Sequence, residues 1–169
     1  IIYTQDMIIY LKNKHSLKIG DFLFDCCVGK GGISYKKIEG DKRTPKGLYD
    51  IGDLYFRKDK IKKFFTKLKR KKIKKNMGWC DDVLNKKYNK MIKIKKNIKH
   101  EKLYRADNKY DLLIPIKYNF KKPKKGLGSC IFIHLTQNYK PTNGCIALKK
   151  KDFLIMLKLI NKRTKILIN

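Results

Sequence analysis

The chain has 169 residues, which is enough to bury one hydrophobic core and is the usual size of a single domain. Its 42% apolar and 11% aromatic content excludes a wholly disordered chain, because burial of that much apolar surface can offset the entropy of ordering. No run approaches the ~20 apolar residues of a membrane-spanning helix, and the opening residues lack a secretory signal pattern. We therefore expect one domain over 1–169, monomeric, with no transmembrane segment and no visible export signal.

The formal net charge of +30 points to polyanionic partners such as nucleic acid, anionic lipid or an acidic polymer. Only five of the 44 basic residues are arginine, whereas bidentate recognition of phosphates and bases favours arginine. A general bias toward lysine, asparagine and isoleucine explains the charge equally well. The charge therefore does not select one class of partner.

The N-terminal part of the chain predicts strands and one long loop. Two short apolar runs, 7–11 and 21–28, are separated by a polar stretch and predict two or three β-strands with tight connections. Glycine, proline and charged residues concentrate in 29–47 and predict an ordered loop of the kind that often carries function. Residues 49–56 predict another strand.

Residues 57–75 form a strongly basic segment, and four apolar residues recur in it near helical spacing: Ile61, Phe64, Phe65 and Leu68. We expect either a short basic amphipathic helix or a mobile arm. A solvated lysine-rich face with one apolar stripe accounts for this pattern, and contact with a membrane surface or a polyanion is the alternative.

The second half of the chain predicts strands at 90–96 and 110–120, followed by a hinge-like stretch. The clearest strand is 129–135, and 145–148 forms another short one. An amphipathic helix of about 150–162 closes the chain, with an acidic residue near its start and lysines near its end, as the helix dipole favours.

Alternation along 129–135 divides its side chains between two faces. Cys130, Phe132 and His134 share one face, and the isoleucines and the leucine between them share the other. The five cysteines form an odd set with no C-x-x-C pair, so neither a full disulfide framework nor a zinc site is indicated. We expect Cys80 and Cys130 to be small buried hydrophobic residues, with Cys130 near any site built around His134.

Nucleophilic catalysis by cysteine needs a thiolate, a base and donors for the oxyanion. His134 ends one predicted strand and Cys145 begins the next, so a hairpin-like arrangement would bring the imidazole to the sulfur and lower the pKa of the thiol toward neutrality. Gly144 lets a substrate carbonyl approach the backbone, and the amides of Gly144 and Cys145 are candidate oxyanion donors. From the pattern alone, a structural cysteine and a core histidine remain the alternative.

The sequence IHLTQNYKPTNGCIAL around these residues resembles the signature of the L,D-transpeptidase catalytic domain (YkuD-type), in which a strand-borne histidine precedes a loop ending in Ser/Thr-x-Gly-Cys. Residues 39–47, EGDKRTPKG, resemble the loop of the same family that has a T-P-x-G core and helps to shape the substrate cleft. Together with the segments between them, the resemblance covers about residues 25–155.

The resemblance implies a mainly β fold, a mixed sandwich or barrel with a few short helices, and a cleft between sheet and loops. It implies a peptidoglycan L,D-transpeptidase of the bacterial cell envelope, with no cofactor and no metal. Cys145 would be the nucleophile, His134 the general base, and stem peptides the substrates, giving 3-3 or 1-3 cross-links. With water as the acceptor the same chemistry would give an L,D-carboxypeptidase.

The substrate subclass stays open because many members carry an arginine two residues after the cysteine, where this chain has Ala147. A cation for a substrate carboxylate would then come from Arg43, Arg105 or Lys149. The alternative for Arg105 is an ion pair with Asp107 or Asp111. The candidate substrate-binding residues are Thr142, Asn143, Arg105, Arg43 and Thr44.

Two rival functions make different predictions. A nucleic-acid-binding module built on 57–75 would bind with steep salt dependence, and its binding would survive Cys145→Ala. A cysteine hydrolase acting on another amide would show thiol-dependent turnover without an amine acceptor. On the resemblance we expect the transpeptidase and no nucleic-acid partner.

Overall fold

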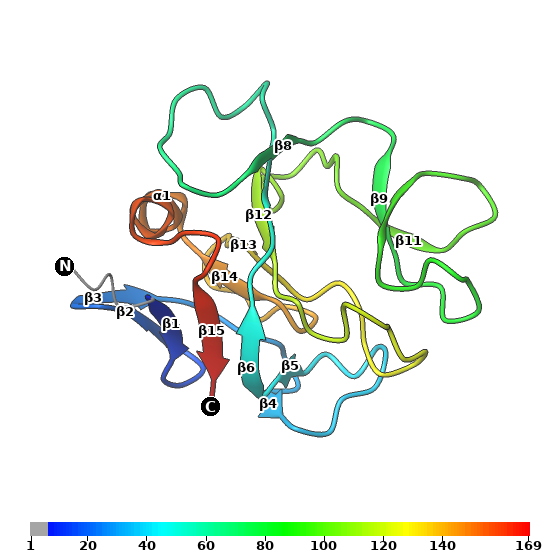
Figure 1. The fold of residues 1–169 in the computed structure, drawn as a ribbon, viewed down its shortest axis with the longest axis horizontal. Coiled ribbons are helices and arrows are strands. Elements are labelled where there is room, and N and C mark those ends of the chain that lie inside the picture. The colour runs from blue at the N-terminus through cyan, green and yellow to red at the C-terminus, as the bar shows by residue number, and fades with distance from the viewer. Residues whose placement is uncertain (1–6) are drawn as a thin grey trace.

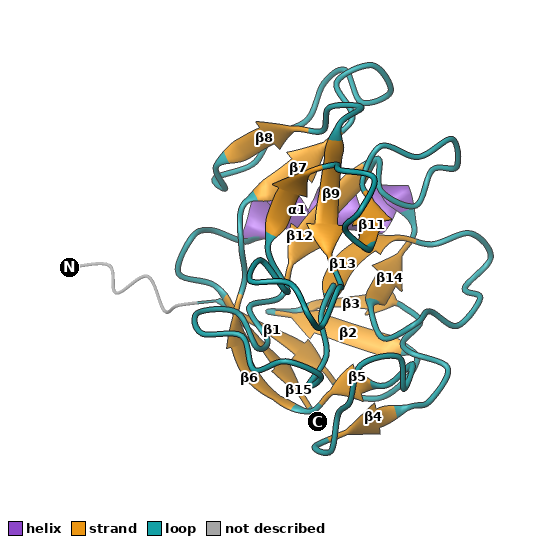
Figure 2. Ribbon diagram, turned by 90° about the vertical axis from the view of Figure 1, so that its right-hand side faces the viewer, coloured by secondary structure: helices purple, strands orange, loops and turns teal. Residues whose placement is uncertain are grey.

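The computed structural model describes residues 7–169, and short strands dominate its fold (Figures 1 and 2). In chain order the strands are β1 (Ile8–Leu11), β2 (Ser16–Ile19), β3 (Phe22–Asp25), β4 (Ile33–Ser34), β5 (Thr44–Pro45), β6 (Gly47–Asp50), β7 (Leu54–Phe56), β8 (Arg70–Lys72), β9 (Met77–Cys80), β10 (Met91–Lys93), β11 (His100–Lys102), β12 (Leu112–Pro115), β13 (Phe132–Leu135), β14 (Ile146–Leu148) and β15 (Lys165–Ile168). One helix, α1 (Lys150–Leu159), lies within the described residues. The mainly β fold is thus confirmed, with one helix there instead of the few that we expected.

Two five-stranded sheets form the frame. The first has the order β3-β2-β1-β15-β6, and the second has the order β14-β13-β12-β7-β8. A third sheet, β10-β9-β11, is smaller, and β4 pairs with β5 in the loop 29–47. At the centre of the first sheet β1 and β15 pair in parallel, although they come from opposite ends of the chain.

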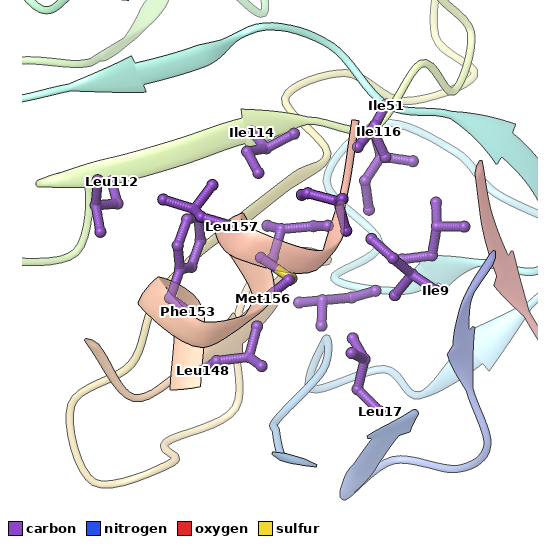
Figure 3. Close-up of a cluster of buried hydrophobic side chains, with 14 of the residues drawn as sticks. Ile9, Leu17, Ile51, Leu112, Ile114, Ile116, Leu148, Phe153, Met156 and Leu157 are labelled. Carbon is purple, nitrogen blue, oxygen red and sulfur yellow. The ribbon is translucent and has the colours of Figure 1, made fainter. Parts of the chain in front are cut away.

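The second sheet separates two hydrophobic clusters. On one face α1 packs through Phe153, Met156 and Leu157 between this sheet and the first sheet, as Figure 3 shows. On the other face lies the third sheet, which contributes Trp79 to a cluster with Phe132 (Figure 2). Both faces of the second sheet are therefore buried, so β12, β13 and β14 are apolar at nearly every position.

The alternation predicted for 129–135 is confirmed. Ile131, Ile133 and Leu135 lie in the cluster that contains α1. Phe132 lies in the cluster on the opposite face, against which Cys130 packs. This strand therefore directs one set of side chains into the main core and the other toward the third sheet.

The strand predicted at 49–56 is wrong as a single element. Residues 47–50 form β6 in the first sheet, whereas 54–56 form β7 in the second. Ile51 makes an isolated bridge to Ile116 where the chain crosses from one sheet to the other. A run that changes sheets has the same apolar pattern as a continuous strand, so periodicity could not separate the two.

For 57–75 we expected either a basic helix or a mobile arm, and the helix is wrong. This segment is irregular up to β8, which pairs in parallel with β7. The apolar residues Ile61 and Leu68 are buried, but they reach the core from loop backbone. Tertiary burial has overridden the helical spacing of the apolar residues.

The C-terminal helix is confirmed but shorter than expected, since it ends at Leu159 and the chain continues into β15. β15 was missed because KILI is too short a run to be told from the end of an amphipathic helix. No helix among residues 7–169 has the length and apolar character needed to cross a membrane.

Candidate active site

The two predicted catalytic residues lie on neighbouring strands of the second sheet. β13 and β14 pair in parallel, with His134 opposite Ala147, so the hairpin that we expected between them is wrong. The loop 136–145 instead carries the chain back to the same end of the sheet. Cys145 comes two residues before Ala147 and directly precedes β14. His134 and Cys145 both line one cavity of about 700 Å³.

The Cys145 thiol is held by the backbone at the start of β13. Its S–H donates to the Cys130 carbonyl at 3.2 Å, and the Phe132 N–H donates to its sulfur at 3.4 Å. The side chain is buried, with only 7% of the residue exposed. Burial raises the pKa of Cys145 to about 12, although the Phe132 N–H lowers it. The resting thiol is therefore protonated, which contradicts our expectation of a pKa near neutrality.

The His134 ring is fixed in one tautomer. Its Nδ1 lies 2.8 Å from the Leu135 carbonyl, and because a carbonyl only accepts, Nδ1 carries the proton and Nε2 the lone pair. Tyr110 packs edge-on against the ring, with the centroids 5.3 Å apart. Burial lowers the pKa of His134 to about 4, so the imidazole is neutral at pH 7.

The resting pair is thus a neutral thiol and a neutral imidazole. Within residues 7–169 no hydrogen bond joins the His134 ring to the Cys145 sulfur, whose proton is directed to Cys130. General-base catalysis requires this S–H to turn from the Cys130 carbonyl toward Nε2.

The turn 142–145 is held by a side-chain hydroxyl. Thr142 Oγ1 donates to the Cys145 carbonyl at 2.6 Å and accepts from the Gly144 N–H at 3.1 Å. Of the two predicted oxyanion donors, the Gly144 N–H is therefore already engaged. The Cys145 N–H makes no hydrogen bond within the described residues, which makes it the better candidate donor.

The loop 29–47 supports this turn from behind. Thr44 is 0% exposed, and its hydroxyl donates to the Gly144 carbonyl and accepts from the Gly29 N–H, both at 2.9 Å. A Cβ on Gly29 would lie 2.9 Å from Gly144 Cα, so the two backbones are in direct contact. Thr44, which we expected to bind substrate, is not among the residues that line the cavity and instead positions the turn.

Thr44→Val should destabilise the protein by about 2 kcal/mol or more, because it leaves a buried N–H and a buried carbonyl without partners. It should also slow the reaction of Cys145, since the turn loses its support. Chemical denaturation and the rate of Cys145 acylation measure the two effects.

Thr164→Val is the matched control, because Thr164 is 1% exposed and accepts from the Asn161 N–H at 2.9 Å, away from the cavity. It should lower stability and leave the acylation rate unchanged. Equal acylation rates in the two variants would argue against a positioning role for Thr44.

The three cations predicted to bind a substrate carboxylate differ in their positions relative to the cavity, and only one of them lines it. Arg105 lines the cavity, but it pairs with Asp107 at 2.7 Å and Glu101 at 3.1 Å, so the ion-pair alternative holds for Asp107. Arg43 is exposed and is not part of the cavity lining. Lys149, also outside the lining, stacks over the Tyr139 ring at 5.1 Å.

The predicted positions of the polar residues are confirmed only in part. Thr142 and Asn143 line the cavity as expected. Asp111, the other partner considered for Arg105, pairs with Lys60 at 3.2 Å instead.

All five cysteines are free, and within residues 7–169 no three His, Cys, Asp or Glu side chains are grouped as metal ligands would be.

Sequence reasoning missed most of the cavity lining, including Lys109 and Tyr110. The Lys109 carbonyl accepts from the Leu135 N–H at 3.0 Å, which places this stretch along β13. Tyr110 contacts the imidazole, but in the sequence it was only the first residue of a predicted strand. Cys130 lines the cavity, as its alternation with His134 indicated, and it adopts a φ of +56° that is uncommon for a residue with a side chain.

Comparison with known proteins agrees with this fold. Residues 2–168 match the profile of the YkuD family, the L,D-transpeptidase catalytic domain. The chain therefore belongs to this family, and the match extends beyond the residues 25–155 over which we noted a resemblance.

One solved structure, that of Bd1075 from Bdellovibrio bacteriovorus, shares the fold with a TM-score of 0.52 at 15% sequence identity. The alignment covers 98% of this chain and 48% of that one, so the chain spans about half the length of the protein it matches. No curated protein matches the sequence.

Proposed function

We propose that this chain is a peptidoglycan L,D-transpeptidase of the bacterial cell envelope, which transfers an acyl group from one stem peptide to an amine of a neighbouring one. The observation that carries the proposal is that His134 and Cys145 line one cavity, with the proton of His134 Nδ1 held on the Leu135 carbonyl. This arrangement leaves the lone pair of Nε2 available as a base, on a residue that shares a cavity with the nucleophile that the family signature identifies.

In the first half-reaction a peptide carbonyl enters the cavity beside Cys145. The thiol proton moves to Nε2 of His134 as the sulfur forms a bond to the carbonyl carbon. The Cys145 N–H donates to the oxyanion that develops. When the carbon–nitrogen bond breaks, the leaving amine takes the proton from the imidazolium, and a thioester remains on Cys145.

In the second half-reaction an acceptor amine attacks the thioester. His134 removes a proton from this amine and returns it to the sulfur as the carbon–sulfur bond breaks. The product is a cross-link of the 3-3 or 1-3 type, according to which carbonyl of the stem is the donor. If water takes the place of the amine, the same steps give an L,D-carboxypeptidase.

Intact mass spectrometry after incubation with a disaccharide-tetrapeptide or a carbapenem tests this proposal. We expect an adduct on the native chain and none on Cys145→Ala, because the variant keeps the cavity and loses only the nucleophile. Product analysis with and without an added amine then distinguishes the transpeptidase from the carboxypeptidase.

Cys130→Ala is the matched control, because Cys130 lines the same cavity and its carbonyl, not its sulfur, accepts from Cys145. This variant should still form the adduct. An adduct that persists in Cys145→Ala, or that is lost in Cys130→Ala while the fold is retained, would contradict the assignment of the nucleophile.

A further inference from the structure

The cavity carries more positive than negative charge. Six cationic side chains line it, against three carboxylates from Glu39, Asp81 and Glu101. Its walls therefore attract anionic groups, and individual lysines become candidates for binding a carboxylate.

Three of the six cations are already paired. Lys37 is buried and binds Asp41 at 2.6 Å, and Lys99 lies 4.0 Å from Asp81. Arg105 is held by two carboxylates, as described above. The other three, Lys42, Lys109 and Lys140, form no ion pair among residues 7–169.

Lys109 differs from the other two unpaired lysines in where its backbone is fixed. Its N–H donates to Asp107 at 3.2 Å, and its carbonyl accepts from the Leu135 N–H, next to His134. Asp107 is itself held by two hydrogen bonds from Arg105. The backbone of Lys109 is therefore fixed relative to β13, the strand that carries His134, while its ammonium group forms no ion pair among the described residues.

The charge of Lys109 reaches both reacting groups. It lowers the pKa of His134 and also that of Cys145, although burial dominates both values. Neither Lys42 nor Lys140 is among the main influences on either group. Lys109 is thus the unpaired cation, among the described residues, that lies electrostatically closest to the reaction centre.

We propose that Lys109 determines donor specificity by binding the terminal carboxylate of the residue that leaves when the thioester forms. The inference rests on the proposed function and names the donor class, peptides in which the scissile bond is followed by one residue with a free carboxylate. Such a carboxylate lies one residue beyond the attacked carbonyl, about 4 Å further along the chain. Lys109 lines the same cavity as Cys145, and its backbone is hydrogen-bonded next to His134.

Binding of this carboxylate also affects the base. A bound anion offsets the charge of Lys109 beside the imidazole, and that charge otherwise disfavours protonation of His134. The correct donor would therefore make His134 a stronger base at the moment when it must accept the thiol proton.

The test compares a donor tetrapeptide that ends in a free carboxylate with the same peptide ending in a carboxamide. The native protein should prefer the acid by about tenfold in kcat/KM, the effect of one charged contact. Lys109→Met should lose this preference through a higher KM for the acid, with the KM for the amide unchanged. Lys109→Arg should restore it, and Lys42→Met, which removes the same charge from the same cavity, should behave like the native protein.

Calorimetric binding of both peptides to Cys145→Ala and to Cys145→Ala/Lys109→Met separates this inference from the proposed function. If the native protein shows no turnover but the acid preference in binding depends on Lys109, the proposed function fails and the carboxylate site stands. The inference is overturned if Lys109→Met keeps the acid preference, if it weakens both peptides equally, or if Lys42→Met has the same effect.

Discussion

His134→Gln should reduce the rate of Cys145 acylation by about 100-fold or more, the usual contribution of a general base. Glutamine replaces the imidazole by a polar side chain of similar size, but its amide cannot accept the thiol proton. The rate of adduct formation, followed by intact mass under single-turnover conditions, measures the loss. His15→Gln is the control, because His15 is an exposed histidine outside the cavity lining, and this variant should react at the native rate.

The pH dependence of this rate follows from the two shifted groups. Because the pKa of His134 is lowered to about 4 and that of Cys145 is raised to about 12, neither group changes its protonation state between these values. The native rate should therefore be level through neutral pH and fall only as the imidazole is protonated near pH 4. An acid limb near pH 6.5, the ordinary histidine range, would show that the resting pair is not neutral.

The same histidine makes stability depend on pH. Its folded pKa of about 4 lies below the ordinary value of 6.5, so the unfolded chain binds a proton first as the pH falls. Its contribution to stability is complete above pH 6.5 and is lost between pH 6.5 and 4, by on the order of 3 kcal/mol. This part of the decline should be missing in His134→Gln when both proteins are denatured with urea across that range.

Gly144→Ala should destabilise the protein by about 3 kcal/mol and slow acylation by about 100-fold, because it strains the backbone and displaces the nucleophile. Gly144 has a φ of +129°, and a Cβ there would lie 2.8 Å from the Arg43 carbonyl oxygen. This contact is with backbone that Thr44 holds in place, so neither side can move freely. Urea denaturation and adduct formation report the two losses.

Gly126→Ala separates backbone strain from the clash. Gly126 also has a positive φ, of +79°, but nothing lies within 4 Å of the position where a Cβ would stand. Gly126→Ala should lower the free energy of unfolding by about 1 kcal/mol through the unfavourable φ alone, and it should leave the rate of acylation unchanged. A similar small effect from Gly144→Ala would show that the turn tolerates displacement.

The sequence brings the candidate site residues together better than it predicts the sheets. The residues proposed to carry chemistry, His134 and Cys145, stand in a short motif whose spacing is local and line one cavity, and alternation along 129–135 assigns the side chains to their faces. Thr44 was found through the T-P-x-G motif, but its role was mistaken, because the partners of a hydroxyl one hundred residues from Gly144 depend on tertiary contacts. Lys109 has no local signal, since it resembles every other lysine in a chain with this composition.

The errors in the fold share one physical cause. In 57–75 apolar residues at helical spacing are buried by a mostly irregular backbone. In 49–56 one apolar run contributes strands to two different sheets. The parallel pairing of β13 with β14 replaced the expected hairpin for the same reason. In each case the long-range partner of a short segment decides its structure, and a single sequence shows the segment without the partner.

The position of β15 has a consequence for biosynthesis. This strand lies between β1 and β6, so the first sheet cannot close until residues 165–168 have left the ribosome. Until then the nascent polypeptide exposes the edges of β1 and β6, two strands that await the same partner. We expect the final collapse of the domain to follow the synthesis of β15 and to be slow, because it joins segments separated by more than 150 positions.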